Sequence, residues 1–148
     1  MRGARVGVSG AILALALSAC SGTPGYLVFD RPQTEKDALG PEFDVVDTSH
    51  LLPETVRYET TYDGIDLYLA RTREGHFCLA LASSWTAMTS CGGPGGPFGV
   101  SGPLGAFQVY PAPVPEEDGW LVLTDNIRVE LPREKYVTTP GPAATPSP

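Results

Sequence analysis

Short apolar runs separated by turn signals occupy the middle of the chain, a pattern typical of antiparallel strands. Residues 56–62 are rich in strand-forming types and end at Asp63-Gly64, a dipeptide that favours a two-residue hairpin turn. Apolar and polar residues then alternate over 65–71, whereas 77–82 are apolar throughout, as in a central strand covered on both faces. With a fourth strand at 86–91, the pattern predicts a small antiparallel β-meander.

The remaining strands are expected nearer the C-terminus. Residues 105–110 have strand character, and 120–124 with 126–130 predict a final strand or strand pair. Residues 92–115 contain 13 glycines or prolines in 24 positions, which argues against regular structure for most of that stretch. We interpret its glycine-rich part, residues 92–105, as a mobile surface loop able to contact a partner. The fold class is therefore mainly β, with about five to seven short strands.

The segment before the meander is predicted to be less regular. Residues 26–29 are apolar and form either an edge strand or a segment packed against the body. A short helical turn is expected over 35–39, because Thr34 and Asp37 have the spacing of a capping box. Residues 42–57 mix acidic and apolar types without a clear period, which predicts irregular structure.

The first twenty residues have the layout of a secretory signal peptide. Arg2 and Arg5 precede an apolar run that ends in small residues. The stretch 6–19 is 14 residues long, whereas a permanent span needs about 20. It ends in Leu17-Ser18-Ala19-Cys20, which resembles the lipobox of bacterial lipoproteins, an aliphatic residue followed by two small residues and a cysteine.

This resemblance implies a lipid anchor at Cys20. A diacylglycerol would be attached to the Cys20 sulfur, and the signal peptidase would recognise Leu17, Ser18 and Ala19 and cut directly after them. The acyl chains, palmitate among them, would hold the mature chain to the membrane, because two or more chains give stable anchoring. Two other interpretations stay open: an ordinary cleaved signal peptide that contains a cysteine, and an uncleaved short anchor.

The chain is acidic, with a formal net charge of −7 over 148 residues. Loss of Arg2 and Arg5 with the signal peptide would leave eight basic and 17 acidic residues, a net charge of −9. Such a surface has no general attraction to nucleic acid and is repelled by anionic headgroups, so the lipid must provide the membrane contact. We expect the protein on the extracytoplasmic face of the cell membrane.

Composition divides the chain into four parts. We assign 1–19 to a lipoprotein signal peptide and 20–42 to a lipid-anchored tether that includes the short helical turn. Residues 43–135 are expected to form the small β domain, and 136–148, rich in proline, a disordered tail.

Cys78 and Cys91 remain once Cys20 carries lipid, and outside the cytoplasm two cysteines usually pair. If Ser84 and Trp85 form the turn, antiparallel register places Cys78 opposite Cys91, within the span of a disulfide. The bond would close a loop of about 14 residues and stabilise the domain by roughly 3 kcal/mol. A redox-active pair and a metal site that includes a histidine are alternatives, but the spacing is not that of a redox motif and a zinc site needs a fourth ligand.

The sequence contains few candidates for catalysis. Its two histidines, His50 and His76, both fall in regions predicted as loop or turn, and His76 is the one considered for a metal site with the cysteines. Ser49 and Asp47 flank His50 closely on an irregular segment, which does not by itself make a hydrolase triad. Paired carboxylates, such as the run 116–118, are interpreted as solvated turns. No cofactor or metal is expected, and the glycine-rich stretch lacks the lysine and the context of a phosphate-binding loop.

Several short motifs are spread over roughly residues 29 to 130. They are Asp30-Arg31-Pro32-Gln33-Thr34 with Asp37 and Leu39, Thr55-Val56-Arg57, Tyr68-Leu69-Ala70-Arg71, Cys78-Leu79, a turn containing Trp85 followed by Thr89-Ser90-Cys91-Gly92, and Asp125-Asn126. In these motifs the body resembles small, uncharacterised lipoproteins of the actinobacterial cell envelope. That family has no assigned activity, so the resemblance implies an envelope location and a disulfide but no mechanism.

The function predicted from these features is a non-catalytic binding or interaction module of the cell envelope. Trp85, at the expected tip of a hairpin, is the candidate contact with an envelope protein. The alternative is a small envelope hydrolase, or an inhibitor of an enzyme, that acts through surface carboxylates.

Overall fold

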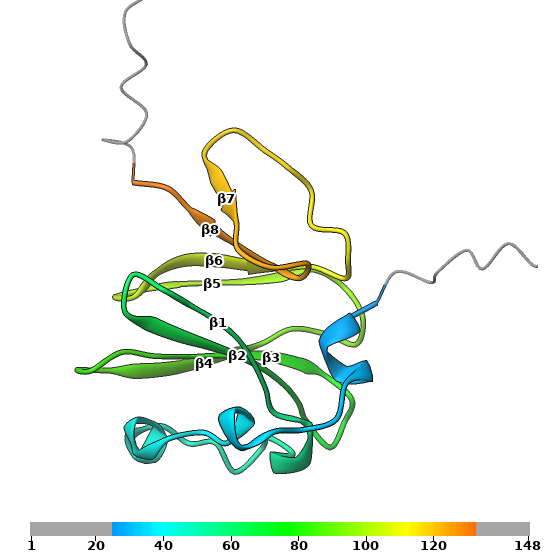
Figure 1. The fold of residues 1–148 in the computed structure, drawn as a ribbon, viewed down its shortest axis with the longest axis vertical. Coiled ribbons are helices and arrows are strands. Elements are labelled where there is room, and N and C mark those ends of the chain that lie inside the picture. Colours follow the sequence, from blue (N-terminus) through cyan, green and yellow to red (C-terminus); the bar gives the residue numbers. More distant parts are fainter. Residues whose placement is uncertain (1–24, 133–148) are drawn as a thin grey trace, which may run out of the picture.

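A computed structural model describes residues 25–132, which form two four-stranded antiparallel sheets and four short 3-10 helices. The sheets lie one above the other, and three of the 3-10 helices cover the outer face of the first sheet (Figure 1). None of the helices in this range is long and apolar enough to cross a membrane. The expectations for 1–24 and for the tail beyond residue 132 lie outside the described residues. The 3-10 helices are η1 (Leu27–Asp30), η2 (Glu35–Asp37), η3 (Pro41–Val45) and η4 (Pro53–Thr55).

The first sheet is the predicted meander, with strands in the order β1-β2-β3-β4. Its first turn needs positive φ at both central residues, and Asp63 and Gly64 have φ of 51° and 75°. The third turn, between β3 and β4, is the tight Ser83–Thr86 loop, closed by the Ser83 N–H donating to the Thr86 carbonyl at 2.8 Å. The strands are β1 (Arg57–Tyr62), β2 (Ile65–Arg71), β3 (Phe77–Ala82) and β4 (Ala87–Cys91).

The register of β3 against β4 confirms the disulfide. Cys78 lies directly opposite Cys91, with Cα atoms 4.0 Å apart, and the two sulfurs are bonded. The same register pairs Ala82 with Ala87 across the turn. The bond therefore joins a central strand to the edge strand of the first sheet.

The second sheet has the order β5-β6-β8-β7 and supplies four more strands, so the total of eight exceeds the expected five to seven. Three of them were predicted, but the prediction of an irregular loop was wrong for residues 98–102. Glycine serves close packing there, since a Cβ on Gly99 would lie 3.1 Å from the Phe107 carbonyl oxygen. The strands are β5 (Phe98–Gly102), β6 (Gly105–Val109), β7 (Trp120–Val122) and β8 (Ile127–Glu130).

The main core lies between the two sheets. One face of β2 and one face of β3 meet the inner faces of β6 and β8, and all these side chains are buried. Burial on this scale is the main force that holds two sheets together. The core residues contributed by these strands are Ile65, Leu67, Leu69, Leu79, Leu81, Phe107, Val109, Ile127 and Val129.

A second core covers the outer face of the first sheet. Ala70, Ala80 and Ala82 are buried there, and their small side chains let the 3-10 layer approach the sheet closely. Phe43 of η3 and Tyr68 of β2 pack edge to face in this core, with ring centroids 5.7 Å apart. The continuous apolar run 77–82 is therefore covered on both faces, as predicted.

The segment before β1 is more ordered than its sequence predicted. Tyr26 is buried and its hydroxyl donates to the Gly96 carbonyl at 2.9 Å, and η1 follows it directly, so 26–29 is a segment packed against the body and not an edge strand. The expected helical turn is η2, and its capping box is formed by Thr34 and Asp37. Residues 42–57 were expected to be irregular, but η3 and η4 form there, each with a proline at its start.

Candidate functional site

A buried ion pair fixes the segment before β1 to the first sheet. Asp37 is fully buried, and its carboxylate accepts hydrogen bonds from the Arg31 guanidinium at 2.6 and 2.7 Å. The backbone N–H groups of Thr34 and Tyr58 donate to the same carboxylate at 2.6 and 2.7 Å. The Arg31 guanidinium, followed by these N–H groups, holds the pKa of Asp37 well below its ordinary value despite the burial.

Two further side chains bind backbone carbonyls in the same corner of the domain, where residues 31–37 meet residues 53–58. The Arg57 guanidinium, although buried, donates to the carbonyls of Arg31, Glu54 and Val56. Gln33 Nε2 donates to the Pro53 carbonyl at 2.8 Å. The motifs around Asp30 and Val56, which are far apart in the sequence, therefore meet in one structural corner.

A small cavity of about 290 Å³ lies beside this corner, between β1 and the turn before β8. Glu59 lines it, and the Oε1 atom of Glu59 is buried with no hydrogen-bond partner among residues 25–132. Burial raises the pKa of Glu59 and the nearby Asp125 carboxylate adds to the effect, while Thr124 and Arg31 partly offset it. This carboxyl thus combines a raised pKa with an unpartnered oxygen, and its place on a strand gave no sequence signal.

The tip of the β3–β4 hairpin presents the most exposed aromatic side chain of the described range. Trp85 is 68% exposed, in agreement with its predicted position at the tip. The Ser83 hydroxyl oxygen accepts hydrogen bonds from the backbone N–H groups of Trp85 at 3.4 Å and Thr86 at 3.3 Å, and these bonds shape the turn. The indole is therefore held out on a short, tight loop.

A depression of about 500 Å³ adjoins this tip. Two acidic side chains, Glu42 of η3 and Asp66 of β2, line it together with hydroxyl-bearing Ser83 and Ser84. Two carboxylates and two serine hydroxyls thus lie next to the exposed Trp85 ring. This arrangement suits a partner that presents positively charged or hydrogen-bond-donating side chains.

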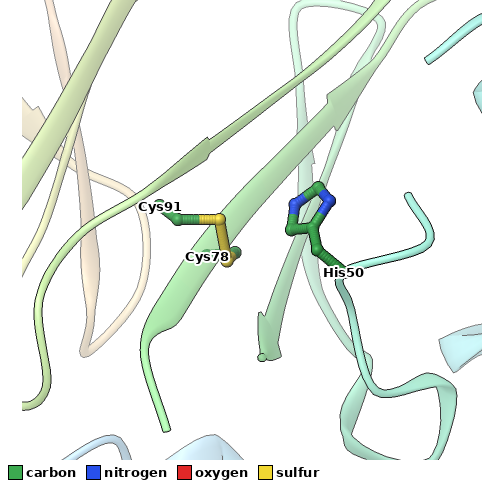
Figure 2. Close-up of side chains that lie close together, drawn as sticks. All are labelled: His50, Cys78 and Cys91. Atoms are coloured by element: carbon green, nitrogen blue, oxygen red, sulfur yellow. A yellow bond between two sulfur atoms is a disulfide. The ribbon is translucent and has the colours of Figure 1, made fainter. Parts of the chain in front are cut away.

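The disulfide has a histidine beside it. His50, from the loop before η4, points its ring towards the Cys78–Cys91 bond (Figure 2). One donor atom from each of these three residues lies within 4.8 Å of the others. His76, the histidine considered for a metal site on sequence grounds, is not in this group, and it is exposed.

The other sequence candidates are not assembled for catalysis. The Asp47 carboxylate accepts the backbone N–H of Ser49 at 3.0 Å, which makes a local turn. Hydrogen bonding from Ser49 lowers the pKa of Asp47. Within residues 25–132, no hydrogen bond joins Ser49, His50 and Asp47 as a relay.

No family model, curated protein or solved structure matches this chain.

Sequence reasoning missed a buried arginine on β8. Arg128 is 3% exposed and donates to Gln108 Oε1, the Tyr110 hydroxyl and Glu117 Oε2, at 2.7 to 2.9 Å. Its guanidinium also lies over the rings of Tyr110 and Trp120, at 4.9 and 4.7 Å from the centroids. Of the acidic run 116–118, only Glu117 has this ion pair, and its side chain is 60% exposed. These contacts fix the long loop before β7, and all three guanidinium nitrogens of Arg128 already donate hydrogen bonds within the domain.

Proposed function

We propose that this protein is a non-catalytic binding module, tethered by lipid on Cys20 to the extracytoplasmic face of the cell membrane. The sequence Leu17-Ser18-Ala19-Cys20 supports the tether, and the Cys78–Cys91 disulfide is consistent with an oxidising compartment. In this proposal the membrane contact is the lipid and the described domain provides the binding surface.

The observation that carries the binding role is the exposed Trp85 beside the acidic depression. An indole that is 68% exposed on a tight hairpin has little conformational freedom to lose when it is covered. Glu42 and Asp66 give the depression negative charge, and the whole chain is acidic. The partner proposed for this face is a segment of an envelope protein that presents lysine or arginine side chains.

Crosslinking in cells tests the contact. A photoreactive residue at Ser84, which is exposed, leaves Trp85 in place. We expect a discrete crosslinked protein whose yield falls with Trp85→Ala and with Asp66→Asn. Leu121→Ala, at a side chain 41% exposed on the second sheet, is the matched control and should retain the product. A product unaffected by Trp85→Ala, or a crosslink to glycan in place of protein, would overturn this assignment.

The lipid anchor is tested separately by mass spectrometry of the membrane fraction. We expect an N-terminal peptide that begins at Cys20 and carries acyl chains, palmitate among them. Cys20→Ala should release the protein from the membrane or block its processing. An unmodified Cys20, or a Cys20→Ala protein that is membrane-bound and processed normally, would refute the tether.

A second candidate function, a small envelope hydrolase or an enzyme inhibitor that acts through carboxylates, is favoured by one observation. Glu59 combines a raised pKa with an unpartnered buried oxygen and has Asp125 beside it in the same cavity. Purified protein that turns over glycan, ester or peptide substrates, and loses that turnover with Glu59→Gln, would favour the hydrolase over the binding module. Inhibition of an envelope enzyme that is lost with the same substitution would favour the inhibitor.

A further inference from the structure

The cluster of His50, Cys78 and Cys91 lies outside the proposed contact face. Within residues 25–132 it is the one group of three or more His, Cys, Asp or Glu donors gathered this closely. In the disulfide form the two sulfurs are bonded to each other and do not act as thiolate ligands.

We propose that reduction of the Cys78–Cys91 bond converts this cluster into a three-ligand site for Cu(I). A dithiol reductant would transfer two electrons and two protons to the disulfide and be oxidised to its own disulfide. Binding of Cu(I) would then release the two thiol protons and form two Cu–S bonds and one Cu–N bond to His50.

The sheet holds the two sulfur ligands in place. Cys78 and Cys91 are directly opposite each other in a ladder of five residue pairs between β3 and β4. That pairing depends on backbone hydrogen bonds, so the two thiols stay adjacent when the covalent bond is cut. Cys91 is exposed whereas Cys78 is buried, which leaves one side of the bond open to a reductant.

Backbone contacts hold the third ligand. Leu51 forms an isolated bridge with Thr72, and the Leu52 N–H donates to the Arg71 carbonyl at 2.8 Å. These contacts attach the loop that carries His50 to the end of β2, which is the neighbour of β3. Figure 2 shows the resulting approach of the imidazole to the two sulfurs.

The donor set favours Cu(I) over other ions. Metal–ligand bonds of about 2.0 to 2.3 Å place neighbouring donors roughly 3.5 to 4 Å apart, so atoms already within 4.8 Å need only small side-chain rotations. Thiolates select soft ions such as Cu(I), and imidazole is also a copper ligand. A structural zinc site would need a fourth protein ligand, and no further His, Cys, Asp or Glu of residues 25–132 joins the group.

Anaerobic competition against a chromophoric Cu(I) chelator tests the site. The protein is the full chain carrying Cys20→Ser, so that the hairpin cysteines are the only thiols. After reduction we expect one Cu(I) per chain, whereas the oxidised protein should not compete with the chelator. His50→Ala should weaken Cu(I) binding about tenfold or more. His76→Ala, the exposed histidine outside the cluster, should bind as the parent does.

Three results would overturn the proposal: equal Cu(I) affinity in the parent and His50→Ala proteins, equal binding by the oxidised form, or tighter binding of Zn²⁺ than of Cu(I). Far-UV circular dichroism of the reduced protein is recorded alongside. If reduction unfolds the domain, added Cu(I) should restore the strand signal, because a ligand bound only by the folded form stabilises it. A signal that stays lost counts against the site as well.

Discussion

Replacement of Asp37 by asparagine is expected to destabilise the domain more than any other single change of a charged side chain in the corner before β1. The Asp37 carboxylate accepts from Arg31, from two backbone N–H groups and from the Thr34 hydroxyl. Asparagine keeps the shape but turns one oxygen into an NH₂ group. That group must face at least one donor now only 2.6 to 2.9 Å away.

The magnitude follows from the burial of the two partners. Removal of one partner of a buried ion pair costs about 3–5 kcal/mol. Asp37 is fully buried, but the Arg31 side chain is 37% exposed and water can solvate it after the change, so we take the lower end, about 3 kcal/mol. In a domain of this size that loss lowers Tm by roughly 15 °C.

The pH dependence has a definite sign. The folded-state pKa of Asp37 is lower than its unfolded value, so the carboxylate contributes stability that is present above about pH 4 and lost as the pH falls further. Wild-type stability should therefore decline below pH 4, and the decline should be shallower in Asp37→Asn.

Urea denaturation followed by far-UV circular dichroism, at pH 7 and across pH 5 to 3, measures both effects. Asp30→Asn is the matched control, because Asp30 is an exposed acid next to Arg31 and should change stability by less than about 0.5 kcal/mol. The reasoning is refuted if Asp37→Asn unfolds at the same urea concentration as Asp30→Asn, or if both variants lose stability in parallel as the pH falls.

Three further outcomes are expected. Replacement of Cys78 and Cys91 together by alanine should lower stability by about 3 kcal/mol in thermal unfolding, and reduction of the wild type should reproduce it. Gly64→Ala should cost about 1 kcal/mol because of the positive φ, whereas Gly93→Ala, which has open space and no positive φ, should cost much less. The raised pKa of Glu59 means that its ionisation opposes folding, so its contribution to stability falls as the pH rises from about 4.3; the stability of Glu59→Gln relative to wild type should increase over that range, and equal pH profiles would contradict it.

The first sheet was predictable because its signals are local. Asp63-Gly64 specifies a hairpin turn, and alternation over 65–71 specifies which side chains of β2 share the face towards the main core. Burial of Tyr68 and Ala70 on the opposite face of β2 depends on the 3-10 layer and has no such signal. The register that joins Cys78 to Cys91 then follows from the position of one turn. Each of these inferences uses residues close together in the chain.

The parts that were missed depend on contacts between distant segments. β5 lies in a stretch whose glycine and proline content predicts a loop. Gly92, before β5, instead allows close packing, because a Cβ on it would lie 2.5 Å from the side chain of Phe98, the first residue of β5. The 3-10 helix η3 is only five residues long and is held by burial of Phe43, so it has no periodicity to detect. His50 is held near the disulfide by the pairing of Leu51 with Thr72 and by the Leu52 N–H donating to the Arg71 carbonyl, both contacts with residues about twenty positions later.

The side chains of the candidate site also differ in whether the sequence predicts their surroundings. Exposure of Trp85 follows from its place at a hairpin tip, and the sequence was sufficient to predict it. Glu59 looks like an ordinary solvent-facing acid of a strand, because its burial comes from the segment at 124–126, more than sixty residues later. No local pattern reports such a contact.

The polar residues of the motifs Asp30–Thr34, Thr55–Arg57 and Asp125–Asn126 mainly stabilise the fold. Arg31 and Asp37 bind each other, Arg57 binds only carbonyls, and Asn126 donates to the Tyr110 carbonyl at 2.9 Å. Their hydrogen-bonding groups are already engaged within the chain, so they have little left to offer a ligand. Trp85 is the opposite case, because its side chain is 68% exposed. Binding by this chain should therefore be sought at the hairpin tip before these motifs.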